Sequence, residues 1–323
     1  NRVLKYIVKR FVQMIVVLFV VSILVFMLTN FIGDPVDMLV PENATMEQVE
    51  SARARLGLDK PLPVQYAIFL KDVLHGNFGK SYTYGKPAMG LILERMPATM
   101  ELVAIAALLV LVIAIPLGVY AGAYPKRASS KIIMSGSILG ISLPSFWVGM
   151  MMIYIFAVTL GKLPASGRGG TVDVLGVNLS IFAPGGIRFI ILPAITLAIT
   201  NVATTLRLTR SGILENMRQD YIKFARAKGV SSRTLLFGHA LKNALIPVVT
   251  IFGMDLGNMI AFTTITETIF AWPGMGKLLI DAINKSDRPI IVAYLMAAAC
   301  MFVVLNFVVD LLYTLIDPRI ELR

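Results

Sequence analysis

The chain has 323 residues, of which 57% are hydrophobic and only 15% charged, whereas a typical soluble domain has about 25% charged residues. The net charge of +11 could indicate nucleic-acid binding, but the basic residues lie in short segments beside apolar runs, so no nucleic-acid partner is expected. The single cysteine, Cys300, excludes an intrachain disulfide and a cysteine metal cluster. Composition therefore indicates an integral membrane protein, and we expect the all-α class.

The first membrane span is predicted at 11–32, after a basic segment at 1–10. Its apolar stretch is longer than that of a signal peptide, and no small-residue cleavage site follows it. We therefore expect residues 1–32 to form a cytoplasmic N-terminus and a retained first transmembrane helix. Residues 33–96 are polar and contain no long apolar run, which predicts an extracytoplasmic region.

Residues 97–323 are expected to form a five-helix core. Its spans are predicted at 99–121, 132–160, 189–206, 245–269 and 290–316. The run 132–160 is interrupted by Pro144, and one kinked helix fits it better than two crossings, which would need at least about 17 residues each. With six spans the two termini share one side, and the predicted inner segments carry 17 of the 30 basic residues. This bias favours a cytoplasmic location for both termini.

The basic segment 207–242, called the coupling segment below, has a helical pattern. Its apolar residues recur at spacings of three and four, which predicts one helix over 213–228 with a single apolar stripe. The residues of this stripe are Leu214, Met217, Tyr221 and Phe224. Gly229 is best able to end that helix in a left-handed conformation, and Ser231 or Ser232 can cap a second helix. We predict a helix, a tight turn and a helix, with a stripe that another surface must cover.

Several motifs resemble those of one protein family. Residues 223–229 read KFARAKG, in the frame of the E-A-A-x3-G motif found in membrane subunits of ATP-binding-cassette (ABC) importers, without the first Glu and one Ala. The stretches 220–229, 239–250 and 267–276 resemble the peptide and nickel permease branch of that family. Further landmarks of the branch occur at 33–35, 56–61 and 76–81. Arg288 departs from the pattern, since the branch usually has an aromatic residue there.

The resemblance implies a type I ABC importer transmembrane domain, with six helices and an extracytoplasmic insertion after the first. It implies a multi-pass subunit of the bacterial inner membrane that moves di- or oligopeptides, or a related small solute, into the cytoplasm. The chain would bind no cofactor, and ATP and Mg would bind partner subunits. The implied partners are a second homologous permease subunit, two ABC ATPase subunits, an extracytoplasmic solute-binding protein and the lipid bilayer. The implied ATPase contacts are Leu214, Met217, Tyr221, Phe224, Ala225, Ala227 and Gly229.

Enzymatic activity is not expected of the chain itself. Gly79, Lys80 and Ser81 suggest a phosphate-binding loop, but that motif needs a glycine where Leu74 stands. The two histidines, His75 and His239, are predicted on opposite sides of the membrane, so we expect no metal site. An intramembrane enzyme would need a nucleophile and a base in one site, and the sequence offers no such pair.

Four carboxylates lie in or near the spans, at Glu101, Asp255, Glu267 and Asp310. Each would cost roughly 2.5 to 3.5 kcal/mol at the centre of a membrane helix. Glu101, Glu267 and Asp310 lie near span ends, where we expect them to reach headgroups or water. Asp255 lies near the middle of its span, so it is either a residue of the translocation pathway or paired with a neighbouring helix. An ion-coupled secondary transporter or channel remains the alternative function, although no inverted repeat supports it.

Small residues spaced by four are expected at helix contacts. Two such pairs stand in the predicted spans, Gly136 with Gly140 and Gly253 with Gly257.

Overall fold

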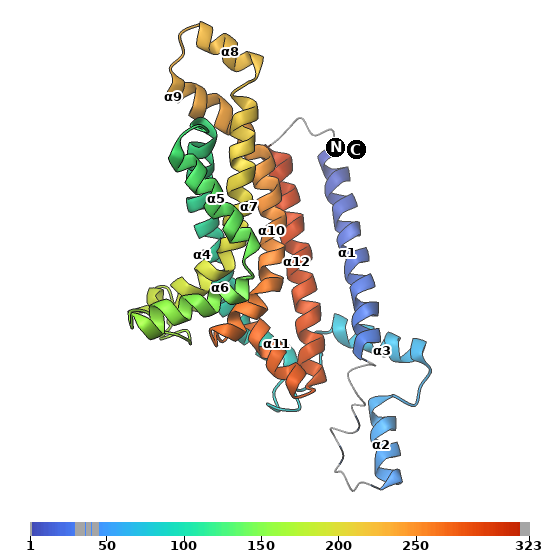
Figure 1. Cartoon of the computed structure of the whole chain (residues 1–323). Helices are drawn as coiled ribbons and strands as arrows, with labels where there is room; N and C mark the ends of the chain where they lie inside the picture. Colours follow the sequence, from blue (N-terminus) through green and yellow to red (C-terminus); the bar gives the residue numbers. More distant parts are fainter. Residues whose placement is uncertain (1, 30–35, 37–39, 41–44, 317–323) are drawn as a thin grey trace. The chain divides into compact units, whose positions relative to one another are not determined.

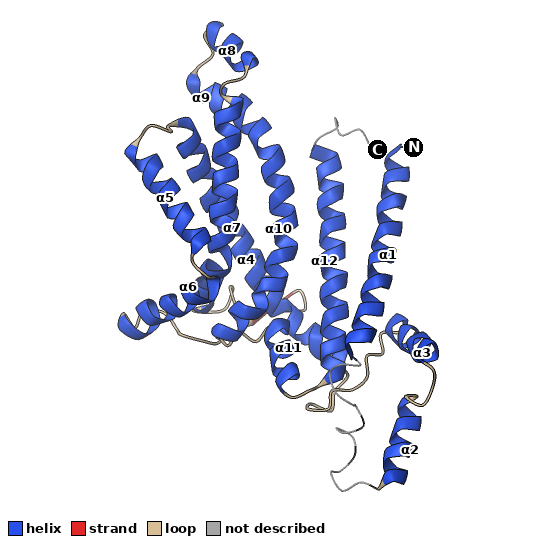
Figure 2. Ribbon diagram, turned by 45° about the vertical axis from the view of Figure 1, so that its right-hand side comes forward, coloured by secondary structure: helices blue, strands red, loops and turns tan. Residues whose placement is uncertain are grey.

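The computed structural model describes residues 2–29, 36, 40 and 45–316. The motif at 33–35, the end of the first predicted span and the C-terminal residues 317–323 lie outside the described residues. The chain divides into two compact units, Asn1–Pro97 with Gly274–Val304 and Ala98–Pro273 with Leu305–Arg323. Helices dominate both units (Figures 1 and 2).

The first unit contains three helices before the long helix α4. These are α1 (Arg2–Thr29), α2 (Met46–Leu56) and α3 (Leu62–Leu74). Thr45 and Gln48 form a capping box at the start of α2, and Gly57 ends it at a φ of 69°. The hydroxyls of Ser22 in α1 and Tyr66 in α3 are 2.8 Å apart. Aromatic contacts of Phe26 with Tyr66 and Phe69 join the same two helices.

The core of the first unit is built from segments far apart in sequence. It contains the start of α4 (Ala88–Ala123), α11 (Met275–Asn284) and the first part of α12 (Arg288–Ile316). Fully buried side chains from all three meet in it, including Ile92, Met275 and Ile290. Because residues 88–97 pack in this core, α4 begins eleven residues before the predicted start of its span at Thr99.

The second unit is a helical bundle around α7 (Gly186–Asn216), which packs against α5, α6 and α10. The unit also contains α4 from Ala98 onward and the end of α12 from Leu305. Its other elements are α5 (Ala128–Ser142), α6 (Ser145–Met152), the π-helix η1 (Ile153–Thr159), β1 (Val172–Val174), β2 (Val177–Leu179), α8 (Asp220–Ala227), α9 (Ser232–Thr234), the π-helix η2 (Leu235–Ala240) and α10 (Leu241–Ile269). The strands pair antiparallel with Val174 opposite Val177. This short hairpin is an addition to the predicted all-α fold.

Helix contacts in the second unit depend on glycine. A Cβ at Gly118 would lie 2.6 Å from the Thr209 side chain, and one at Gly122 would lie 2.7 Å from Ile213. The predicted contact at Gly253 is confirmed, because a Cβ there would clash with the side chain of Val309. The prediction is wrong for Gly136, which faces open space within 4 Å. Spacing alone cannot tell the packed face of a helix from its free face.

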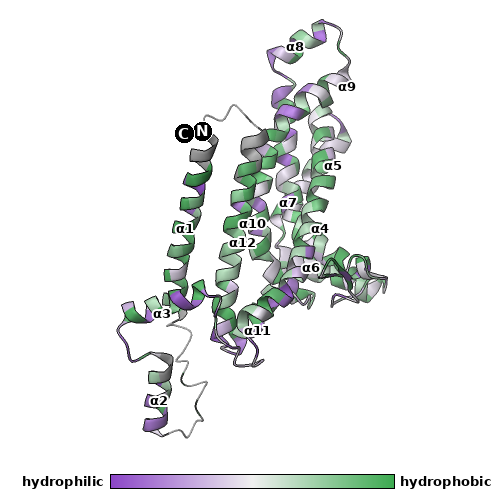
Figure 3. Ribbon diagram, turned by 180° about the vertical axis from the view of Figure 1, so that it is seen from behind, coloured by the Kyte–Doolittle hydropathy of each residue, from purple (hydrophilic) through white to green (hydrophobic). Residues whose placement is uncertain are grey.

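Within the described residues, five helices are long and apolar enough to cross a membrane, and one bent helix pair brings the number to six if it counts as one span. Figure 3 shows that α1 and α12 are hydrophobic along most of their length. The bent pair is α5 with α6 and η1, which meet at 105°. The predicted interruption at 142–145 is confirmed, but the run forms two separate helical segments and not the single kinked helix that was expected. At 15 residues, α5 is about 22 Å long, shorter than the roughly 30 Å hydrocarbon core.

Candidate functional site

The coupling segment lies at the end of α7, with α8 and α9 projecting beyond the helix bundle (Figure 1). The predicted single helix over 213–228 is wrong, since α7 ends at Asn216 and α8 begins at Asp220. Asn216 explains the break. Its amide donates to the carbonyl of Gly212 at 2.9 Å and accepts from the Tyr221 hydroxyl at 2.9 Å. Such local side-chain bonds compete with continued helix.

The break changes which residues are covered within the chain. Ile213 and Ile222 are fully buried and pack in one apolar cluster with Val119, Leu235 and Ala244. The predicted stripe is split, because Leu214 and Met217 lie half-buried at the end of α7 whereas Tyr221 and Phe224 stand exposed on α8. Ile222 is thus the residue that anchors α8. It lies outside the predicted stripe, because that stripe requires one uninterrupted helix over 213–228.

Gly229 turns the chain as predicted. Its φ is 83°, and two backbone bonds close the turn, from Gly229 to the carbonyl of Arg226 at 3.0 Å and from Val230 to that of Ala225 at 3.2 Å. This pattern is a Schellman motif, which favours glycine at the left-handed position. The next helix is capped by Ser231, whose hydroxyl accepts from the Thr234 amide at 3.2 Å. The predicted turn between helices is confirmed here.

The outer surface of α8 combines an aromatic side chain with charge. Phe224 is 63% exposed, and the Lys228 ammonium lies 4.5 Å from its ring centroid. Lys223 pairs with Asp220 at 2.8 Å, and this hydrogen bond and charge lower the pKa of the Asp220 carboxyl. Of the two alanines of the motif, Ala225 is half-buried and Ala227 is exposed. The outer face of α8 thus presents two exposed aromatic side chains, Tyr221 and Phe224, on a helix that Ile222 anchors.

Asp255, the candidate pathway residue, is half-buried on α10. Asn258 lies three residues along the same helix, on roughly the same face. Asp255 follows Gly253 by two residues, which places it on roughly the opposite face from the contact with Val309. No salt bridge within the described residues involves Asp255, and its role as a pathway residue or as the partner of a neighbouring helix stays a prediction.

Glu101 was expected to reach headgroups or water, and this prediction is wrong. Its side chain is 2% exposed and accepts from the Arg168 Nη2 at 2.6 Å. The backbone amides of Ser180 and Ile181 also donate to it, each at 2.7 Å. We call these four residues the Glu101 network. It fastens the loop before α7 to α4, and protein donors replace the water that the span-end position suggested.

Glu267 was also expected to reach headgroups or water, but it is fully buried, at 0% exposure. Its side-chain carboxylate accepts a hydrogen bond from the Thr99 hydroxyl at 2.6 Å. Its backbone carbonyl accepts one from the backbone amide of Trp272 at 2.8 Å. The Trp272 indole, also fully buried, donates to the carbonyl of Ala98 at 2.9 Å. The conspicuous stretch 267–276 thus begins as a structural corner. For Asp310, the third residue expected near water, the side chain lies outside the described residues.

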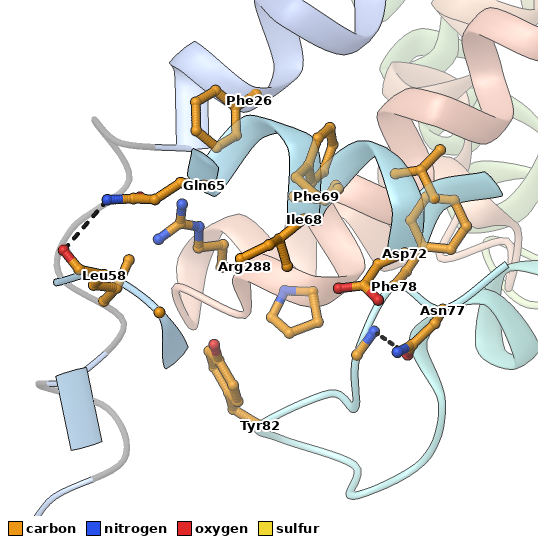
Figure 4. Close-up of a pocket in the computed structure, with 15 residues that line it drawn as sticks. Phe26, Leu58, Gln65, Ile68, Phe69, Asp72, Asn77, Phe78, Tyr82 and Arg288 are labelled. Carbon is orange, nitrogen blue, oxygen red and sulfur yellow. Dashed lines mark hydrogen bonds between the residues drawn. The ribbon is translucent and has the colours of Figure 1, made fainter. Parts of the chain in front are cut away.

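In the first unit a pocket of about 290 Å³ is lined by residues of α1, α3 and the start of α12 (Figure 4). Its polar residues include Asp72, Tyr82 and Arg288. Burial raises the pKa of the Tyr82 phenol, against the lowering effect of the Arg288 charge. The neighbouring Asp287 is fully buried and accepts from the Ser81 hydroxyl at 2.5 Å. The departure from the family pattern at Arg288 therefore changes a pocket lining, while Asp287 fixes the loop.

The sequence matches two family profiles along almost its whole length. Residues 114–322 match the binding-protein-dependent transport system inner membrane component, and residues 3–103 match the N-terminal region of the same kind of membrane component. The chain belongs to this family. The coupling segment, with Phe224 and Gly229, falls within the first match.

Named relatives share more than a third of their residues with the chain. The di/tripeptide transport system permease protein DppB of Pseudomonas aeruginosa is 39% identical, covering 98% of this chain and 99% of the relative. The oligopeptide transport system permease protein AppB of Bacillus subtilis is 38% identical over the same shares. A structure titled as inward facing conformations of the MetNI methionine ABC transporter has a TM-score of 0.54 at 14% identity, covering 71% of this chain and 97% of that one. That likeness supports the fold of an ABC transporter membrane subunit.

Proposed function

We propose that this protein is the membrane subunit of an ATP-driven importer that moves di- or oligopeptides into the cytoplasm. The observation that carries the proposal is α8, which is anchored by the buried Ile222 and presents the exposed Phe224. The peptide permease names of the relatives support the substrate class. The chain itself would not hydrolyse ATP, and ATP and Mg would bind two partner ATPase subunits. A second permease subunit and an extracytoplasmic binding protein would complete the importer.

The coupling segment would transmit motion in two steps. Phe224 and Tyr221 would insert into a groove on the ATPase, with Ala227 and Gly229 at the rim. Movement of the ATPase would then pass through Ile222 to the apolar cluster that contains Ile213 of α7. Because this cluster also contains Ala240 at the end of η2 and Ala244 at the start of α10, displacement of α8 would move the ends of both α7 and α10. Asp255 on α10 would then line the pathway that opens.

The decisive test is reconstitution of the chain with its partner subunits in vesicles. Uptake of a labelled dipeptide should require ATP and the binding protein, and it should continue when the proton gradient is dissipated. An ion-coupled secondary transporter would behave in the opposite way, since dissipating the gradient would stop its uptake while removal of ATP would not.

The proposed orientation places both termini in the cytoplasm. In a Cys300→Ser background, cysteines at Asn77 and Asn178 should react with a membrane-impermeant thiol reagent added to intact cells. The inner reporter should be Lys126, which is exposed, because the nearby Ser130 is only 1% exposed and would react poorly from either side. Labelling at Lys126 from outside would reverse the orientation.

A further inference from the structure

A groove of about 570 Å³ runs between α5 and α7, both within the second unit. Its apolar lining comes from Met134 and Ile141 of α5 and from Leu208 of α7. Its charged lining comes from Arg207 and Arg210, where α7 enters the coupling segment. None of the proposed coupling contacts lines this groove.

Arg210 is an unusual side chain in the described structure. Its Nε atom is buried and has no hydrogen-bond partner among the described residues. A buried donor without a partner is costly, and a guanidinium matches a phosphate or carboxylate in geometry. Arg207 lies three residues earlier, so the two guanidinium groups lie near the same face of α7. Together they suit an anionic group held at the mouth of the groove.

The charged side chains that line the groove, Arg207 and Arg210, are both positive. Its other polar lining residues are Thr204 and Ser211, and no Asp or Glu is among the residues described as lining it. Lys131, exposed on the first turn of α5, adds a positive charge one turn before Met134. The groove is therefore basic toward the end of α7 and apolar toward Ile141.

We propose that this groove binds an anionic phospholipid, with the phosphate at Arg207 and Arg210 and an acyl chain along Leu208, Met134 and Ile141. A basic pocket between membrane helices is a known form of lipid headgroup recognition. A free peptide fits less well, because its ammonium group would find no carboxylate there. A nucleotide fits less well too, because no aromatic ring lines the groove for its base. The orientation proposed above would place the bound phospholipid in the cytoplasmic leaflet. Only this placement, and not the binding itself, rests on that orientation.

The binding test uses the complete importer, delipidated in detergent and followed by native mass spectrometry. Phosphatidylglycerol should bind as a discrete adduct, whereas phosphatidylcholine with the same acyl chains should bind weakly. Replacing both arginines, Arg207→Gln with Arg210→Gln, should weaken phosphatidylglycerol binding roughly twenty-five-fold, since each basic residue near an anionic lipid contributes about fivefold. The matched control is Arg233→Gln, an exposed arginine outside the groove, which should bind as the unaltered chain does.

A second variant covers the case in which the double replacement does not assemble. Ser211→Glu keeps α7 helical and places a carboxylate among the arginines, so it should also displace the lipid. Equal binding of the two lipids, or unchanged phosphatidylglycerol binding in either variant, would overturn the proposal. Displacement of the lipid by inorganic phosphate alone or by a dipeptide at similar concentration would overturn it too, in favour of a free anion or a peptide. Because the readout is lipid retention, it is independent of whether peptides are transported.

Discussion

The segments that precede and follow α7 differ in how far their charged and aromatic side chains are buried. Before α7, the Glu101 network joins a carboxylate that is 2% exposed to a guanidinium that is 11% exposed, and every donor in it comes from the chain. After α7, Phe224 is 63% exposed and Lys223 pairs with Asp220 at the surface.

The difference separates a region that fixes the fold from one that needs a partner. Buried charges must be satisfied internally, so the Glu101 network can hold its loop in only one arrangement. The Phe224 ring on α8 is exposed to solvent, so its burial against a partner would contribute binding free energy to a complex. Substitutions in the first region should therefore disturb the protein itself, and those in the second should disturb only its assembly.

The largest effect on stability is expected from Glu101→Ala. The change leaves Arg168 buried without its counter-charge and removes the acceptor of two backbone amides, so it should cost about 3 to 5 kcal/mol. The midpoint of thermal aggregation in detergent would show the loss as a clear decrease. The control is Asp281→Ala, which removes a half-exposed partner of Lys277 and should cost about 0.3 to 0.5 kcal/mol. Similar midpoints for the two variants would mean that the network does not fix the fold.

Phe224→Asp should abolish assembly while leaving the melting midpoint unchanged. The ring is exposed, so the chain loses little internal packing, but a charge would enter the proposed ATPase groove. Co-purification of the ATPase subunits and peptide uptake measure the effect. Lys223→Ala on the same helix is the control and should do much less. If Phe224→Asp retained both its ATPase and its uptake, α8 would not be the docking surface.

The membrane helices could be predicted from the sequence more reliably than the contacts of the two regions. A run of about 20 apolar residues has few alternatives to a membrane helix, and Gly229 could be predicted because its turn depends on neighbours within five residues. The partners of buried groups could not be predicted in this way. Glu101 and Arg168 are 67 residues apart, and Ser81 and Asp287 are 206 apart. The anchor Ile222 was missed because a side-chain bond of Asn216 ends α7, and the residue pattern carries no sign of that end.

A smaller effect is expected at the turn that orients α8. No atom lies within 4 Å of a Cβ built at Gly229, so substitution there should cost only backbone strain. Gly229→Val should destabilise the turn by about 1 to 2 kcal/mol, and Gly229→Asn by less, because Asn adopts the left-handed conformation more readily. ATPase retention should therefore fall in Gly229→Val and largely survive in Gly229→Asn. Equal losses in both variants would point to a direct contact at Gly229 and not to its conformation.

Asp255 belongs to neither region, and its replacement should have the smallest effect on the protein itself. The carboxylate is half-buried, and no salt bridge among the described residues gives it a counter-charge of the kind that Arg168 provides for Glu101. Asp255→Asn keeps the shape and removes only the charge, so assembly and thermal midpoint should stay unchanged. If the residue lines the pathway, the maximal rate of peptide uptake should fall severalfold, because a charged contact to the solute is lost. A variant that fails to assemble with its ATPase would instead place Asp255 with Glu101, as a carboxylate that holds the structure.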